Sequence, residues 1–444
     1  MTALTNRSLL ATPNLTTRAR AHNRPFGTLN LPPLHPNCRL IVTIPAKDEA
    51  DFIEHTLTAV TNQTTPAGIP IDPTSYEVII LANNCSDNTA GVVRSFACQP
   101  TLHQRQQRTP PALSRELRPT IHVAERTLPP PIACVGTARR LMMDTALDRF
   151  IEAGNPHGMI CTTDADTLVH REWVYWTLQS AAEGARAVGG RILVPDADRS
   201  AAGPYRKDHL LDVTYRSLQY CLESMMDPDP ADPWPRHFQH FGPSTAVRVD
   251  AYLACGGIPP LKCLEDVGLV NALERVDIPV THNRNVKVYT SSRISHRVDG
   301  RGFSEQLNEW ADLRQGGGTQ FVPGLENCRW LFKFKVALRR AFHRGTPAKG
   351  DWTLLRLAAE LRISYAELRE FIDKASSFGS LYQDVRERLL ASASFSDEPI
   401  ELAVQQLRRF TASLRNQARR ATATIKTVGT HPTGTAPAAQ RVAG

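Results

Sequence analysis

Short apolar runs alternate with helix-like segments through the first 170 residues, and this alternation limits the fold more than any other feature of the chain. The apolar runs cover residues 40–46, 76–82, 121–124 and 158–163. Between them, apolar residues recur at helical spacing, most clearly over residues 136–153. The pattern predicts a mostly parallel sheet with helices on both faces, and ligands bind such sheets at the carboxyl ends of the strands.

Two carboxylates one residue apart, Asp164 and Asp166, follow the fourth apolar run directly. Hard oxygen ligands at the carboxyl edge of a sheet suit Mg²⁺ or Mn²⁺, above all where the ion also holds a diphosphate. A short acidic pair also occurs by chance, and it often caps the helix that follows. The pair therefore has to be interpreted together with the loops that follow other strands.

Three further polar segments accompany this pair. Lys47-Asp48-Glu49 follows the first run, and Asn83-Asn84-Cys85-Ser86-Asp87 follows the second, where Ser86 and Asp87 suit the start of a helix. Glu265 and Asp266 open a later helical pattern. The helix dipole favours acids in a first turn and would alone explain the last two residues.

The four segments, in this order, resemble the family 2 glycosyltransferases, which have the GT-A fold, and the resemblance covers about residues 38–305. Their joint occurrence is far more specific than any single motif. The resemblance implies an enzyme that moves a sugar from a nucleotide-diphosphate sugar, of UDP or GDP type, to a hydroxyl of a sugar, lipid or small-molecule acceptor. Where the family usually has an acidic pair in the second loop, this chain has Asn83 and Asn84, whose amides offer both a donor and an acceptor to a nucleobase.

The resemblance also implies roles for individual residues. Asp166 would bind the divalent metal, Mg²⁺ or Mn²⁺, with His296 as a further ligand, while Asp164 would contact the ribose or the water shell of the metal. Asp266, beside Glu265 in the catalytic pair, would take the proton from the acceptor hydroxyl of an inverting enzyme, which is worth about 10²–10⁴-fold in rate. Contacts with the donor nucleotide are expected from Pro45, Glu49, Asn83, Asp87, Arg139, Asp164, Arg293 and Arg297.

Other interpretations of several of these residues stay open. A lone histidine such as His296 is more often hydrogen-bonded in a loop than a metal ligand. Two groups of arginines suit a diphosphate, namely Arg139 with Arg140 and the arginines of residues 291–303. The second group also fits a solvated basic loop. Within residues 291–303, Gly300 and Gly302 favour a lid that closes over the donor.

The segment between the metal and base motifs borders the acceptor in the family. Trp234, His237 and Phe241 could therefore face an acceptor, and they fit a hydrophobic core equally well.

After about residue 305 the chain is expected to be helical. An apolar stripe over residues 330–342 is interleaved with basic residues, so this helix either packs on its own domain or lies on an anionic membrane surface. Residues 354–368 resemble two short helices joined by a turn, as in helical hairpins and in some DNA readers. We expect an N-terminal extension over residues 1–37, a helical region over residues 306–421 and a disordered tail from residue 422.

The composition suits an intracellular enzyme. A net charge of +8 favours anionic ligands, without requiring nucleic acid as a partner. Nine scattered cysteines, no evident signal peptide and no apolar stretch of membrane-spanning length predict a cytoplasmic protein, with peripheral membrane contact left open. Alternatives are a non-catalytic or regulatory sugar-nucleotide-binding protein whose basic tail engages nucleic acid or a partner, a retaining transferase and a nucleotidyltransferase.

Overall fold

The computed structural model of the chain describes residues 15–99, 118–193, 206–290, 309, 312–313, 316–345, 351–391 and 397–428. Its central strands are β1 (Leu40–Ala46), β2 (Tyr76–Asn83), β3 (Thr120–Arg126), β4 (Met159–Thr162), β5 (Thr167–Val169), β6 (Ala187–Leu193), β7 (Thr245–Arg248) and β8 (Thr281–Thr290).

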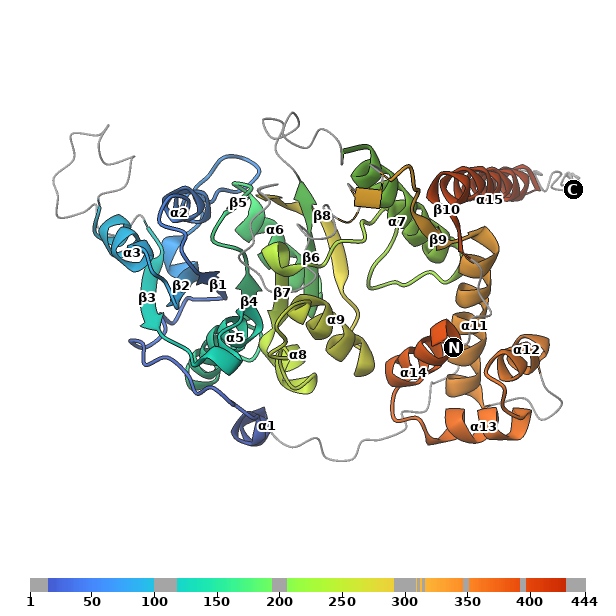
Figure 1. Cartoon of the computed structure of the whole chain (residues 1–444), viewed down its shortest axis with the longest axis horizontal. Coiled ribbons are helices and arrows are strands. Elements are labelled where there is room, and N and C mark those ends of the chain that lie inside the picture. The colour runs from blue at the N-terminus through green and yellow to red at the C-terminus, as the bar shows by residue number, and fades with distance from the viewer. Residues whose placement is uncertain are drawn as a thin grey trace, which may run out of the picture.

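These strands form one eight-stranded sheet in the order β3-β2-β1-β4-β7-β6-β8-β5 (Figure 1). Four of the seven neighbouring pairs are parallel, β1 with β2 and with β4, β2 with β3, and β6 with β8. The pairs β4 with β7, β6 with β7 and β5 with β8 are antiparallel. The expected fold class, a mixed and mostly parallel sheet flanked by helices, is thereby confirmed.

Helices cover both faces of the sheet. One face carries α2 (Ile53–Thr61), α3 (Thr89–Cys98) and α6 (Trp173–Ala182), and the other carries α1 (Leu15–Ala21), α5 (Val135–Glu152), α8 (Val249–Ala254) and α9 (Glu265–Arg275). Val42 and Ile44 of β1 pack with the first group, whereas Ile41 packs with the second. Successive side chains of a strand point to opposite faces, so a strand covered on both sides has to be apolar throughout.

The N-terminal extension packs against the sheet domain. Ala19 and Leu29 belong to the same hydrophobic core as α5, and Arg24 Nε donates to both carboxylate oxygens of Asp148 at 2.9 Å. The part of the extension that the structure describes is therefore fixed to the sheet domain, although its expected boundary at residue 37 stays a prediction.

The expected helical region follows the sheet. It comprises α11 (Leu325–Arg344), α12 (Trp352–Glu360), α13 (Tyr365–Lys374), α14 (Phe378–Ala391) and α15 (Ile400–Val428), with a two-stranded sheet of β9 (Phe321–Pro323) and β10 (Asp397–Pro399). The long helix α7 (Arg206–Met226) comes earlier in the sequence, between β6 and β7, and packs against this region. α15 packs along α7, and α14 meets α9, where Asp277 Oδ1 accepts a hydrogen bond from Gly379 N at 2.7 Å (Figure 1).

Two further expectations concern this region. The two short helices predicted over residues 354–368 are α12 and α13, and Arg362 takes the left-handed conformation (φ 56°) in the turn where glycine is usual. α15 continues to Val428, beyond the expected start of a disordered tail at residue 422, and that boundary stays a prediction. In the described ranges, no helix combines the length and the apolar character that crossing a bilayer requires.

Candidate active site

The polar segments singled out in the sequence meet at one edge of the sheet. β1, β2 and β4 are parallel neighbours, so the residues that follow each of them lie at the same edge. β7 runs antiparallel to β4 with Thr245 opposite Thr162, which brings the short 3₁₀-helix η5 (Gly242–Ser244) to this edge as well. α9 begins there too, because a carboxylate of its first turn hydrogen-bonds the start of η5.

Arg139 of α5 joins the end of β4 to the start of α9. Its side chain is 4% exposed, and its guanidinium donates hydrogen bonds to Asp164 Oδ1, to Thr162 Oγ1 and, at 3.1 Å, to the carbonyl oxygen of Gly242. Arg139 Nε also lies 2.9 Å from Glu265 Oε1, an ion pair in which the N–H is not aligned for a hydrogen bond. One buried cation thus holds two carboxylates from distant stretches of the chain.

Asp266 is half-buried and faces η5. Its Oδ2 accepts a hydrogen bond from Gly242 N at 2.6 Å, and its Oδ1 accepts one from Val267 N at 2.7 Å. Leu264, just before the acidic pair, has φ 57°, a left-handed conformation that costs a residue of this type on the order of 1–3 kcal/mol. The surrounding structure therefore fixes both the backbone before Asp266 and the orientation of its carboxylate.

The carboxylates at this edge affect one another electrostatically. Burial raises the pKa of Asp164, Arg139 opposes this rise, and the charges of Asp166 and Asp266 add to it. Burial likewise raises the pKa of Glu265, with Arg139 opposing and Asp266 and Asp164 adding to the rise. A divalent cation would relieve this crowding of negative charge, so the donor set fits Mg²⁺ or Mn²⁺.

The residues expected to bind the metal are only partly described. Asp166 is half-buried just before β5, and its charge acts on Asp164. His296, like Arg293 and Arg297, falls within residues 291–308, outside the described residues. The assignment of both metal ligands, and of the two arginines to the donor, therefore stays a prediction.

Polar side chains after β1 and β2 suit a nucleobase. Asn83 is 6% exposed, and within the described part of the chain its Oδ1 has no hydrogen-bond partner. The side chain of Asn84 is engaged instead, since it donates to Leu128 O at 2.9 Å and accepts from Leu128 N at 3.0 Å. Glu49, 9% exposed, and Pro45, half-buried in β1, lie at the same edge. Of these two neighbouring amides, Asn83 is therefore better placed than Asn84 to bind a ligand.

A second acidic group fastens the loops after β1 and β2 together. Asp48, Cys85 and Asp87 offer ligand atoms within 4.8 Å of one another, and no other such group occurs among the described residues. Asp48 Oδ1 already accepts from Ser86 N at 2.6 Å, which lowers the pKa of Asp48, and Asp87 Oδ2 accepts from Ala50 N at 2.9 Å. Burial raises the pKa of Cys85, so the thiol stays protonated and is a poor ligand. The hydrogen bonds explain this group, and the expected donor contact of Asp87 stays a prediction.

The aromatic residues considered for the acceptor differ in exposure. Trp234 is 42% exposed and Phe241 is half-buried, whereas His237 is 9% exposed with its Nε2 3.3 Å from Asn283 O. His237 belongs to a buried group in which His240 Nδ1 lies 3.0 Å from His282 Nε2. The core interpretation holds for His237. Trp234 is exposed, with the Arg415 guanidinium 5.7 Å from its ring centroid, and its contact with an acceptor stays a prediction.

Gly242 was not found by reasoning from the sequence. Its N–H binds Asp266 and its carbonyl binds Arg139, and a Cβ placed on it would lie 2.6 Å from Arg139 Nη2. No local pattern marks this glycine, because its importance comes from side chains far away in the sequence.

Three solved structures are among those similar to this chain. A mannosyltransferase from Pyrobaculum calidifontis, in complex with GDP-Man and Mn²⁺, is 16% identical with a TM-score of 0.37, over 86% of this chain and 95% of that one. TarS 1–349 of S. aureus with UDP-GlcNAc is 11% identical with a TM-score of 0.37, over 80% and 89% of the two chains. Glucosyl-3-phosphoglycerate synthase from Mycobacterium tuberculosis, with Mn²⁺, UDP-Glc and phosphoglyceric acid, is 16% identical with a TM-score of 0.33, over 67% and 90%.

Two of these proteins are a mannosyltransferase and a glucosyl-transferring synthase by name, and all three structures hold a nucleotide sugar. No protein-family model matches the chain, and no curated protein matches it either. Likenesses with TM-scores below 0.5 carry no argument about this chain, so its activity has to be inferred from the side chains of the site.

Proposed function

We propose that the protein is a metal-dependent glycosyltransferase that moves a sugar from a nucleotide-diphosphate sugar to an acceptor hydroxyl with inversion at the anomeric carbon. The observation that carries the proposal is the contact of Arg139 with Asp164, after β4, and with Glu265, beside Asp266. Arg139 thereby links the carboxylates after β4, which suit a metal ion, to Asp266, which suits the removal of a proton from the acceptor.

Asp266 is the proposed general base. The O–H bond of the acceptor breaks and its proton passes to the Asp266 carboxylate, while the acceptor oxygen bonds to the anomeric carbon and the bond from that carbon to the diphosphate oxygen breaks. Two backbone N–H groups hold the carboxylate in place for this transfer. Glu265, with a side chain 6% exposed and facing Arg139, is better suited to positioning than to proton transfer.

A bound divalent metal would stabilise the negative charge that builds on the departing diphosphate. Asp166 is the residue proposed to hold it, with His296 as a further ligand. Asp164 is fixed by Arg139 and would face the ribose or the water shell of the metal. The guanidinium of Arg139 contacts protein acceptors in this structure, so its direct contact with the donor stays a prediction.

The donor nucleotide is proposed to place its base against Asn83 and Glu49. Asn83 Oδ1, which has no partner among the residues that the structure describes, would accept a hydrogen bond from an N–H of uracil or guanine, which leaves UDP and GDP donors both possible. Contacts from Pro45 and Asp87, the acceptor, a cytoplasmic location and contact with a membrane surface also stay predictions.

Thermal unfolding with UDP or GDP, each with and without Mn²⁺, tests donor binding. A ligand that binds only the folded state at 100 times its Kd stabilises it by about 2.7 kcal/mol, so metal-dependent binding is readily seen. A positive response leads to a screen of nucleotide sugars, with the anomeric configuration of the product determined by NMR. Retention of configuration would indicate a retaining transferase, and absence of any nucleotide response would favour the non-catalytic alternative.

Asp266→Asn tests the base separately from binding. Turnover is expected to fall by about 10²–10⁴-fold, while the metal-dependent response to the nucleotide remains. Asp277→Asn is the matched control, because Asp277 also accepts backbone hydrogen bonds but joins the other end of α9 to α14. Equal losses of turnover and nucleotide binding in Asp266→Asn would show that Asp266 is structural.

A further inference from the structure

α11 carries three basic side chains that form no ion pair within the described part of the chain. Among its six lysines and arginines, Arg329 pairs with Glu326 at 2.6 Å, Lys335 pairs with Glu223 at 2.6 Å, and Arg339 pairs with Asp227. The other three, Lys333, Arg340 and Arg344, are exposed and have no ion pair with any described carboxylate.

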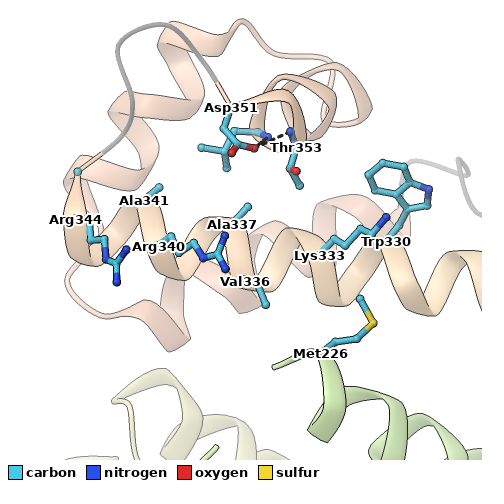
Figure 2. A pocket seen from close by; sticks show the side chains of 12 residues that line it. Met226, Trp330, Lys333, Val336, Ala337, Arg340, Ala341, Arg344, Asp351 and Thr353 are labelled. Atoms are coloured by element: carbon cyan, nitrogen blue, oxygen red, sulfur yellow. Dashed lines mark hydrogen bonds between the residues drawn. The ribbon is translucent and has the colours of Figure 1, made fainter. Parts of the chain in front are cut away.

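These three side chains share one side of the helix. Their spacing of seven and four residues places them within about 40° of one another around α11. All three line a cavity of about 470 Å³ between α11 and the start of α12. Figure 2 shows them spaced along α11, with Asp351 and Thr353 of the α12 start across from that helix.

One carboxylate, Asp351, lines the same cavity. It caps α12, because its Oδ1 accepts from Thr353 N at 2.8 Å and from Leu354 N at 3.4 Å. The lining therefore keeps a net positive charge, and the acid that is present is held by its own helix.

An unusually exposed aromatic residue lies next in sequence to residues that line the cavity. Trp352, between two lining residues, is 87% exposed, more than any other large apolar side chain that the structure describes. Leu355, three residues further along α12, is 37% exposed. Tryptophan with neighbouring cations is the combination that binds the interface of an anionic bilayer, with the ring among the headgroups and the cations on the phosphates.

We propose that this corner, Lys333, Arg340 and Arg344 of α11 with Trp352 of α12, binds the surface of a membrane that contains anionic phospholipids. The cavity takes headgroup phosphate, and Trp352 enters the interface beside it. Lys335, paired with Glu223 of α7, and Arg339, paired with Asp227 just after α7, hold α11 in place from another side. The binding is independent of the reaction proposed at the sheet edge.

Sedimentation of the full-length protein with lipid vesicles tests the proposal. We expect binding to vesicles of phosphatidylcholine with 30% phosphatidylglycerol, no binding to pure phosphatidylcholine, and weaker binding as salt increases. Each cation near an anionic surface contributes about fivefold in affinity, so Lys333→Gln/Arg340→Gln/Arg344→Gln should weaken binding on the order of 10²-fold. Trp352→Ala should weaken it about tenfold.

The control variant removes three exposed cations elsewhere, as Arg39→Gln/Arg171→Gln/Arg284→Gln. It should retain most of the binding, and thermal unfolding should show that all variants are folded. Equal losses in both triple variants would show a nonspecific effect of net charge and overturn the proposal. Binding of an oligonucleotide without binding of vesicles, binding of inorganic phosphate alone, or no response to either vesicle would overturn it as well.

Discussion

Replacing Arg139 by methionine removes the buried cation that holds the site together. The variant leaves Glu265, with a side chain 6% exposed, as a buried carboxylate without its partner, whereas Asp164, 30% exposed, is partly screened by water. Breaking a buried pair by deleting one partner costs about 3–5 kcal/mol, and here the Glu265 contribution dominates. The loss is a large part of the roughly 5–15 kcal/mol that stabilises a typical domain.

Denaturant unfolding measures this loss, and Arg140→Met is the matched control. Arg140 is the next residue of α5 and is also buried, with its Nε 2.7 Å from Asp144 Oδ2 and its Nη1 bound to the carbonyls of Gly256 and Ile258. Both variants should lose stability to a similar extent. At a temperature where both are folded, only Arg139→Met should also lose the Mn²⁺-dependent response to UDP or GDP.

A second substitution separates charge from packing. Glu265→Gln in the Arg139→Met background removes the uncompensated charge, so it should recover most of the lost stability without restoring nucleotide binding. A loss below about 1 kcal/mol in Arg139→Met, or strict additivity of the two substitutions, would refute the argument that a buried ion pair organises this edge.

Three further predictions address other parts of the structure. Asp166→Ala should abolish the Mn²⁺-dependent shift in thermal unfolding with nucleotide, and a normal shift would show that the ion is held elsewhere. Gly242→Ala places a Cβ 2.6 Å from Arg139 Nη2 and should cost about 1–3 kcal/mol in denaturant unfolding, whereas an unchanged midpoint would contradict the packing. Burial lowers the pKa of His237 and of His240 from 6.5 to about 3, with the charge of His282 adding to both shifts, so the fold keeps them neutral while the unfolded chain binds protons below pH 6.5. The free energy of unfolding should therefore keep its full value above that pH and fall by about 2 kcal/mol per histidine at pH 5. The double variant His237→Asn/His240→Asn should remove this fall. A wild-type stability that does not change between pH 7 and pH 5 would contradict the prediction.

The strands that the sequence predicted best are those covered on both faces. The apolar run over residues 40–46 coincides with β1, and the run over residues 76–82 falls inside β2 (Tyr76–Asn83), which is buried along its whole length. β8 (Thr281–Thr290) begins with polar residues rather than with an apolar run, because these residues have partners far away in sequence, such as His282 with Asp232 at 2.7 Å. β6 contains Gly190, and a Cβ added there would lie 1.9 Å from Ser244 Oγ. The close contact with η5 requires a glycine, so this part of the strand lacks the apolar side chains from which a strand is predicted.

The site shows a different limit of prediction. The sequence placed Arg139 and Arg140 together near the donor, but one residue along a helix is a rotation of about 100°, and only Arg139 faces the sheet edge. α5 is buried on nearly every side, so it has no polar face from which the direction of either side chain could be inferred. The same holds for Asn83 and Asn84, of which the second is engaged by the backbone of Leu128. In both pairs the residue type and its approximate location follow from the sequence, whereas the choice between neighbours depends on the partner that the fold brings to each.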